Sequence, residues 1–139
     1  MNIFFDMDYT ILSATGRLRP RVVETFNQLR EDGHSLYIWS GIGVRVAEVR
    51  DLGLLPLVQG VYEKPVQDYR RMLAGMLRRG ELPTPPDFVV DDYPEVVSAL
   101  GGVSVRPYVN DDPEDTEMAR VYDAIHQRVS APDACADGG

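Results

Sequence analysis

The sequence predicts an α/β fold, a doubly wound, Rossmann-like parallel sheet of five strands with helices on both faces. Short, continuous apolar runs alternate with segments of helical periodicity along the whole chain. Apolar runs without alternation are typical of strands that are buried on both faces of a parallel sheet. The length of 139 residues suits one domain, so we expect a single core domain over residues 1–129.

The first half of the chain contains three of the expected strands. They are expected at residues 3–5, 36–39 and 57–61. The third strand is the weakest, because its apolar run is interrupted by polar residues and glycine. The helix between the first two strands begins near Pro20, which suits a first helical turn, and Gly33 ends it. A short helix over residues 43–52 leads to the third strand.

The second half of the chain supplies the remaining elements. Helices are expected over residues 66–79, 94–100 and 114–129, and strands at residues 88–90 and 103–105. Apolar residues repeat at helical spacing in the first and the last of these helices, which predicts one buried face for each. Residues 130–139 are small and polar, and we expect them to form a disordered tail.

Composition and charge exclude several classes of protein. The chain has 14 basic and 22 acidic residues, and the net charge of −8 argues against non-specific binding to nucleic acid or to an anionic membrane. Its one cysteine, Cys135, cannot form an internal disulfide. No apolar run approaches the ~18 residues of a membrane span, and the N-terminus lacks the pattern of a signal peptide. We therefore expect a soluble, cytoplasmic protein.

Polar side chains follow four of the expected strands. They are Asp6, Asp8 and Thr10 after the first, Ser40 after the second (followed by Gly41), Lys64 shortly after the third, and Asp91 and Asp92 after the fourth. Because the carboxyl ends of parallel strands meet at one edge of the sheet, we expect these residues to form one site. Lys64 is the only lysine in a chain with 14 basic residues. A compact ammonium at a phosphate is not readily replaced by a guanidinium, so this position favours a functional role.

The expected site has the chemistry of phosphoryl transfer. Four carboxylates cannot all ionise side by side without a counter-charge, and Mg²⁺ is the natural cation for such oxygen ligands. Mg²⁺ also binds phosphate, and hydroxyls, an ammonium and the amides of a strand-to-helix turn can hold the other phosphoryl oxygens. In such a site one aspartate attacks phosphorus and another handles the proton of the leaving group.

These motifs resemble those of the haloacid dehalogenase superfamily, in particular its phosphatases. Asp6-Met-Asp8-Tyr-Thr10 is similar to the first motif of the family, and Ser40 ends the second strand as in its second motif. Lys64 is similar to the lysine of the third motif, and the pair Asp91-Asp92 looks like the fourth. The likeness covers about residues 2–106, with all four motifs in the order of the family.

The resemblance implies a role for each residue. Asp6 would be the nucleophile that forms an aspartyl-phosphate, and Asp8 would be the general acid and then the general base. The residues implied to hold the phosphate are Ser40, Gly41, Lys64 and Thr10, the last also supporting the loop. Mg²⁺ would be bound by the Asp6 carboxylate, the Asp8 backbone carbonyl and either Asp91 or Asp92.

The resemblance also implies a family member without a cap domain. The two segments where the family inserts a cap are here about a dozen residues and only a few residues long. Members of this type act on large substrates or borrow a lid from a neighbouring subunit, so the substrate would be a phosphorylated small molecule or a macromolecular end. A homo-oligomer is compatible with this expectation. Tyr9 stands where the family often has glycine, and its ring could shape or crowd the pocket.

Two other functions are compatible with parts of the pattern. The chain could keep the fold and bind phosphate or act as a scaffold without catalysis, as Tyr9 and the missing cap suggest. It could also be a phospho-signalling domain similar to response-regulator receivers, which combine the same residue types. The order of the motifs argues against the receiver, because Lys64 here precedes the pair Asp91-Asp92.

Several conspicuous residues have structural explanations. We expect Trp39 in the core. Arg17, Arg19 and Arg21 lie near the expected mouth of the site, and we favour a plain surface role over contact with an anionic substrate. The acidic run at residues 111–117 suits the start of a helix, where it would be solvated.

Overall fold

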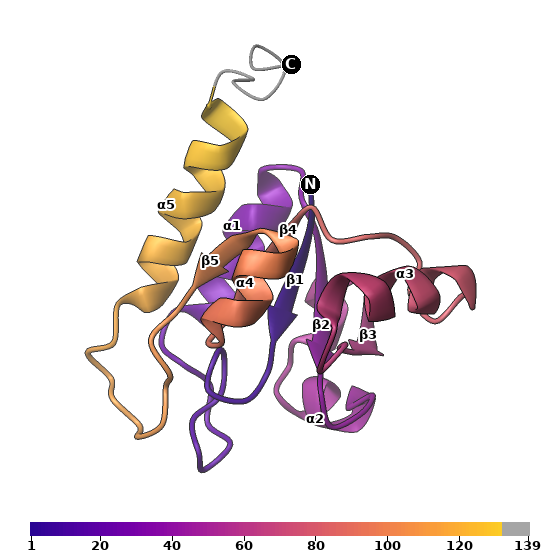
Figure 1. Ribbon diagram of the computed structural model, residues 1–139. Coiled ribbons are helices and arrows are strands. Elements are labelled where there is room, and N and C mark those ends of the chain that lie inside the picture. The colour runs from indigo at the N-terminus through magenta and orange to yellow at the C-terminus, as the bar shows by residue number, and fades with distance from the viewer. Residues whose placement is uncertain (132–139) are drawn as a thin grey trace.

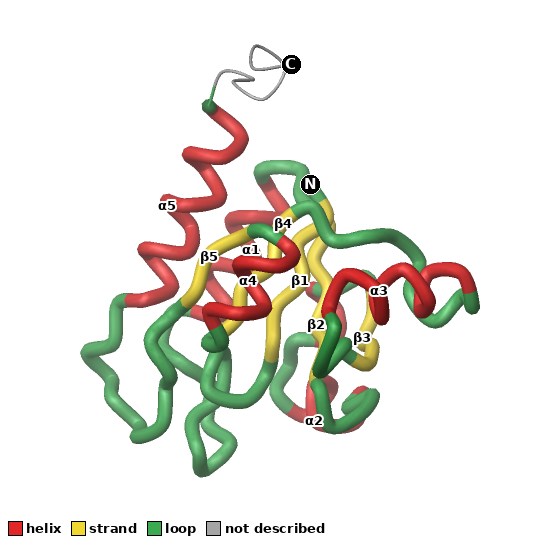
Figure 2. Tube along the Cα trace, viewed as in Figure 1, coloured by secondary structure: helices red, strands yellow, loops and turns green. Residues whose placement is uncertain are grey.

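Five parallel strands form the central sheet in the computed structural model, which describes residues 1–131. The strands are β1 (Asn2–Asp6), β2 (Ser35–Ser40), β3 (Gly60–Glu63), β4 (Phe88–Asp91) and β5 (Gly102–Ser104). Their order in the sheet is β3-β2-β1-β4-β5, and every neighbouring pair is parallel (Figure 2). The predicted doubly wound fold is confirmed. Most of the expected disordered tail, residues 132–139, lies outside the described residues.

Helices cover both faces of this sheet. They are α1 (Val22–Glu31), α2 (Val46–Asp51), α3 (Tyr69–Arg78), α4 (Pro94–Leu100) and α5 (Glu117–Ser130), with a 3-10 helix, η1, at Leu55–Leu57. Figure 1 shows α4 in front of the sheet and α1 behind it. Helix α5 packs beside α1, and α3 packs beside α4. None of the helices in residues 1–131 is both long and apolar enough to span a bilayer.

The apolar side chains of β1 are buried in both layers of the core, one on each face of the sheet. Ile3 and Phe5 belong to the cluster under α1 and α5, whereas Phe4 belongs to the cluster under α3 and α4. The ring of Phe4 lies 4.7 Å from that of Trp39, which is fully buried as expected. Since successive side chains of a strand point to opposite faces, burial on both faces requires an unbroken apolar run.

The strand order reverses beside β1. The chain passes from β1 to β2 and β3 on one side, and β4 then returns to the other side of β1. Ligands of open α/β sheets bind at such a switch point, beyond the carboxyl ends of the strands. Asp6 ends β1 and Asp91 ends β4, so two acidic residues border this crevice. The segment at residues 7–21 is too short to hold a separate domain, and Lys64 directly follows β3, so neither of the two expected insertion points holds one.

The third strand begins later than its apolar pattern predicts. Expected at residues 57–61, β3 instead spans Gly60–Glu63, because Leu55–Leu57 form the 3-10 helix η1. Pro56 stands at the first turn of η1, a position that suits proline. Leu55 and Leu57 pack partly buried against the core from this turn. The shift places Lys64 directly after the last residue of β3.

Helix α3 also begins later than expected. Its periodic pattern predicts a start at Val66, but the helix begins at Tyr69 after Asp68, which has a left-handed φ of 44°. Val66 therefore lies in the loop after β3, with 54% of its surface exposed. This loop borders the carboxyl ends of the strands, so the correction moves an apolar side chain from a helix face to the edge of the site.

The acidic run before α5 is not fully solvated, contrary to expectation. Glu117 is buried and accepts hydrogen bonds from the Arg120 guanidinium at 2.8 Å and from the Arg106 backbone N–H at 2.9 Å. The Arg120 hydrogen bond, against the opposing effect of burial, lowers the pKa of Glu117 to about 2. Glu117 therefore fixes the start of α5 against the loop after β5.

Replacing Glu117 with Gln should remove a pH-dependent part of the stability. Because the pKa of Glu117 is lower in the folded protein than its ordinary value of 4.5, its contribution is complete above pH 4.5 and is lost as the pH falls toward 2. The difference in unfolding free energy between wild type and Glu117→Gln should therefore be constant from pH 6 to about pH 4.5 and should shrink between about pH 4.5 and pH 3. Urea unfolding across this range measures it, and a constant difference would contradict the role of the charge.

Candidate functional site

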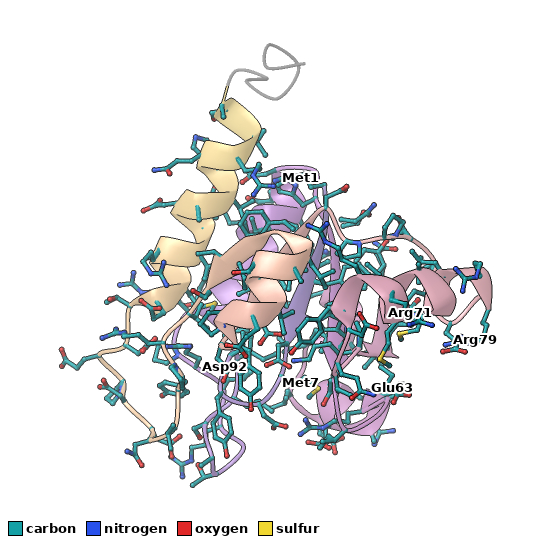
Figure 3. All side chains as sticks on the ribbon, viewed as in Figure 1. Met1, Met7, Glu63, Arg71, Arg79 and Asp92 are labelled. Atoms are coloured by element: carbon teal, nitrogen blue, oxygen red, sulfur yellow. The ribbon has the colours of Figure 1, made fainter. Side chains whose placement is uncertain are left out.

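The polar residues predicted from the strand ends meet at one end of the sheet. Figure 3 shows Met7, Glu63 and Asp92, which end or follow three different strands, at the lower end of the sheet and Met1 at the opposite end. Phe5 of β1 pairs with Val90 of β4, so the residues that follow them, Asp6 and Asp91, come side by side. The parallel register of β1 and β4 therefore brings these two carboxylates together.

Three buried carboxylates form the centre of the site. Asp6, Asp91 and Asp92 each offer an oxygen atom, and these oxygens lie within 4.8 Å of one another. The Nζ atom of Lys64 donates to Oδ1 of Asp6 at 3.1 Å and to Oδ2 of Asp91 at 2.9 Å. One ammonium thus faces three carboxylates, which leaves a local excess of negative charge.

The carboxyl groups hold their protons more tightly than usual. Burial raises the pKa of Asp6 to about 6, although the charge of Lys64 opposes this shift. Burial also raises the pKa of Asp91 and of Asp92. Burial acts to lower the pKa of Lys64, but the charges of Asp6 and Asp91 outweigh it, and the pKa of the ammonium is raised. Within residues 1–131, Lys64 is the cation that pairs with these carboxylates, so a further cation would lower the cost of ionising all three.

Thr10 ties two of the carboxylates together. Its hydroxyl lies 3.0 Å from Oδ2 of Asp6 and 3.3 Å from Oδ1 of Asp92, and the residue is fully buried. The threonine thereby links the loop after β1 to the residue after β4. This position suits the expected support of the loop better than the expected contact with phosphate.

Asp8 lies apart from the acidic cluster, beside Arg45. Nη1 of Arg45 donates to Oδ2 of Asp8 at 2.8 Å and to Oγ of Ser40 at 3.2 Å. The same guanidinium is held by Glu48 on α2 through two further hydrogen bonds of 2.9 and 2.6 Å. The Asp8 side chain is 43% exposed, whereas the three carboxylates of the cluster are buried.

Ser40 and Gly41 form the turn after β2. The backbone N–H of Ile42 donates to Oγ of Ser40 at 3.3 Å, and the backbone N–H of Lys64 donates to the carbonyl oxygen of Ser40 at 2.9 Å. A Cβ atom at Gly41 would come within 2.8 Å of Cγ1 of Val66, so a side chain here would displace that valine. The turn therefore sits close to the loop that carries Lys64.

Arg19 is buried inside the protein, contrary to the expected surface role. Its guanidinium forms an ion pair with Asp115 at 2.7 Å, and both side chains are at least nine-tenths buried. The guanidinium also donates to the carbonyl oxygens of Thr10 at 3.1 Å and Arg106 at 2.8 Å. This ion pair joins the loop after β1 to the segment before α5 and supports Thr10 from behind.

Replacing Asp115 with Asn should destabilise the protein by roughly 3 kcal/mol, because it leaves the buried Arg19 charge without its partner. Two carbonyl oxygens would still accept hydrogen bonds from the guanidinium, which keeps the loss at the lower end of the range for broken buried pairs. Urea unfolding measures the effect, with Asp123→Asn on the exposed side of α5 as the control. An equal, small effect of both variants would contradict a structural role for the ion pair.

A cleft of about 360 Å³ opens beside the acidic cluster. Six of the predicted site residues line it: Asp6, Asp8, Ser40, Gly41, Lys64 and Asp92. Tyr9 also lines the cleft, and its backbone has a left-handed φ of 63°. Cavities of this size hold small molecules in many proteins, and here the polar groups of the wall converge on Asp6.

Arg45 is the site residue that the motifs did not indicate. It lies at the end of the loop at residues 41–45, one of the loops that border the expected site, but nothing in its local sequence marks it. Its partner Asp8 lies 37 residues away along the chain, so only the folded structure brings the two together.

Comparison of the chain with models of known protein families gives no match, and comparison with curated proteins gives none. The likeness to the haloacid dehalogenase superfamily therefore depends on the four motifs and on their positions. In the structure these motifs follow four strands and meet at the carboxyl edge of the sheet, where Asp6, Asp8, Asp92, Lys64 and Ser40 line one cleft.

Proposed function

We propose that the protein is a Mg²⁺-dependent phosphomonoesterase that works through phosphoryl transfer to Asp6. The observation that carries this proposal is the convergence of Asp6, Lys64 and Ser40 on one cleft, next to a carboxylate cluster with too little positive charge. A nucleophile, phosphate ligands and a cation site in one cleft are the parts that phosphoryl transfer requires.

The first step forms an aspartyl-phosphate. A carboxylate oxygen of Asp6 attacks phosphorus, the bond between phosphorus and the alcohol oxygen breaks, and protonated Asp8 gives its proton to the leaving alcohol. In the second step Asp8 takes a proton from water, whose oxygen attacks the same phosphorus, and Asp6 is regenerated with release of inorganic phosphate. The half-exposed position of Asp8 at the cleft suits both proton transfers.

The residues present fit a magnesium ion. Asp6 and Asp92 line the cleft, whereas Asp91 does not, and its oxygens accept hydrogen bonds from Lys64 at 2.9 Å and from the Tyr93 backbone N–H at 2.9 Å. We therefore assign Asp92 and Asp6 as the carboxylate ligands and Asp91 as the partner that holds Lys64. The Asp8 backbone carbonyl is the expected third ligand. Bound Mg²⁺ would neutralise this cluster and polarise the phosphoryl group.

Arg45 would act as a positioning residue in this mechanism, because it orients Asp8 and contacts Ser40. Replacing Arg45 with Ala should lower kcat/KM about tenfold, the order of magnitude of losing one partly exposed charge-assisted hydrogen bond. The variant Arg45→Lys should recover part of the loss. Steady-state kinetics measure this, with Arg50→Ala on α2 as the control, since within residues 1–131 Arg50 is exposed and pairs with the exposed Asp51. Equal kinetics of Arg45→Ala and wild type would contradict the assignment.

A phosphate-release screen tests the proposed function. Sugar phosphates, nucleotides, phosphopeptides, nucleic-acid ends and aryl phosphates are incubated with the protein in Mg²⁺ or in EDTA. The proposal expects Mg²⁺-dependent release from at least one class. Mg²⁺ binding without release from any ester would instead support a non-catalytic phosphate-binding protein, and a long-lived phospho-adduct without turnover would support a receiver-like domain.

A further inference from the structure

The cleft beside Asp6 has an unusually apolar rim. Among residues 1–131, nine large hydrophobic side chains are exposed, and four of them line this cleft. These four are Tyr9, Ile42, Val66 and Tyr93. Single exposed apolar residues are ordinary, but a group gathered around one cleft marks a binding surface.

The polar and apolar parts of the wall belong to one cavity. Asp6, Ser40 and Lys64 line the same cleft of about 360 Å³ as Ile42 and Val66. Tyr69, Tyr93 and Val96 complete the apolar side. A phosphoryl group held by the polar residues would thus leave its alcohol portion against aliphatic and aromatic side chains.

The backbone of Tyr9 has a conformation that suits glycine better than tyrosine. At a φ of 63° glycine is unstrained, whereas a tyrosine is held there by hydrogen bonds from its N–H to the Leu12 carbonyl and from the Tyr108 N–H to its own carbonyl, each 2.8 Å. Its ring lines the cleft and is 39% exposed, so it gains little from burial in the core. A strained backbone at a residue that lines a cleft suggests that the Tyr9 side chain contacts a ligand there.

We propose that the cleft selects phosphomonoesters of apolar alcohols, with aromatic alcohols preferred; this inference depends on the proposed phosphatase function. The alcohol portion packs against Tyr9, Ile42, Val66 and Tyr93. Ile42 and Val66 offer no hydrogen-bond partners, so a sugar hydroxyl placed against them would lose its contacts with water without replacing them. Apolar and aromatic alcohols instead bury surface that both partners otherwise expose.

Two esters of primary alcohols with different polarity test the selectivity. Benzyl phosphate and glycerol 3-phosphate have leaving groups of comparable reactivity, so the ratio of their kcat/KM values reports binding of the alcohol portion. We expect wild type to prefer benzyl phosphate by roughly tenfold or more, the order of discrimination that apolar contacts supply. Tyr9→Gly and Ile42→Ser should each lower the ratio several-fold. Val129→Ser, which changes an exposed residue of α5 away from the cleft, is the control.

The fold should survive both substitutions, since glycine suits the backbone at position 9 and the Ile42 side chain is 76% exposed. Hydrolysis of 4-nitrophenyl phosphate through Asp6 with equal kcat/KM for the two test esters would overturn the inference and leave the proposed function standing. A concentration-dependent dimer that Ile42→Asp dissociates would also overturn it, because the rim would then be a subunit interface.

A binding measurement keeps the two proposals separate. Calorimetry compares benzylphosphonate, which cannot be hydrolysed, with 2,3-dihydroxypropylphosphonate. Tighter binding of benzylphosphonate that Tyr9→Gly weakens would support the apolar subsite even if no ester were hydrolysed, and the proposed function alone would fail. Equal affinities for the two phosphonates would overturn the subsite.

Discussion

Replacing Asp6 with Asn should abolish Mg²⁺-dependent phosphate release, with a loss of roughly a thousandfold or more in kcat. An amide oxygen has almost the same shape as the carboxylate oxygen but cannot attack phosphorus to form an acyl phosphate. Release of 4-nitrophenol from 4-nitrophenyl phosphate measures the rate. Turnover within a few-fold of wild type would contradict a covalent mechanism at this residue.

The Asp6→Asn variant should remain folded. The amide oxygen can still accept the hydrogen bond from Lys64, and the amide NH2 can donate to the Thr10 hydroxyl, which then donates to Asp92. The variant also carries no charge at this position, where burial raises the pKa of Asp6 to about 6. Circular dichroism and thermal unfolding check the fold. Asp51→Asn is a matched control, since this carboxylate is 71% exposed on α2 and lies outside the cleft.

Replacing Lys64 with Met should destabilise the protein by about 3–5 kcal/mol and abolish phosphate release. The substitution removes the ammonium that contacts Asp6 and Asp91 and leaves three buried carboxyl groups without a cation. Urea unfolding in EDTA measures the loss of stability without contribution from a metal. A destabilisation below about 1 kcal/mol at pH 8 would contradict the proposed charge balance.

The destabilisation by Lys64→Met should depend on pH. Burial raises the pKa of Asp6, Asp91 and Asp92, and loss of the ammonium raises these pKa values further. The folded variant then binds more protons than the unfolded chain above pH 4, so it gains stability relative to wild type as the pH falls from 8 to 5. The double variant Lys64→Met, Asp6→Asn carries one charge less and should be more stable at pH 8 than Lys64→Met alone. A double variant of equal or lower stability would contradict this explanation.

Strands β1 and β3 show how far local sequence predicts the fold. Ile3, Phe4 and Phe5 are buried on both faces of the sheet, so their apolar run has a direct structural cause and was predicted. Strand β3 lies at the sheet edge, where only Val61 is buried, and its pattern is correspondingly weak. The stronger apolar run just before it packs on the core from a 3-10 helix, because burial depends on side chains and is compatible with more than one backbone form.

The site was predictable where the strands themselves position the residues. Asp6, Ser40 and Asp91 are the last residues of three parallel strands, so the sheet brings them together. The prediction of a surface role for Arg19 is wrong because the burial of this residue depends on its ion pair with Asp115. Asp115 lies 96 residues away along the chain, in an acidic run that resembles a solvated helix start. The partners of a residue that lies in a loop can be identified only from the whole folded structure.

The most direct test of a nucleophilic Asp6 is to trap the phosphorylated enzyme. In an Asp8→Asn variant the activated ester 4-nitrophenyl phosphate needs no proton on its leaving group, whereas attack of water on the aspartyl-phosphate loses its general base. The mechanism predicts a burst of 4-nitrophenol close to one equivalent per protein molecule and, after acid quench, a phosphate on the peptide that contains Asp6. The absence of a burst, or phosphate on another residue, would contradict the mechanism.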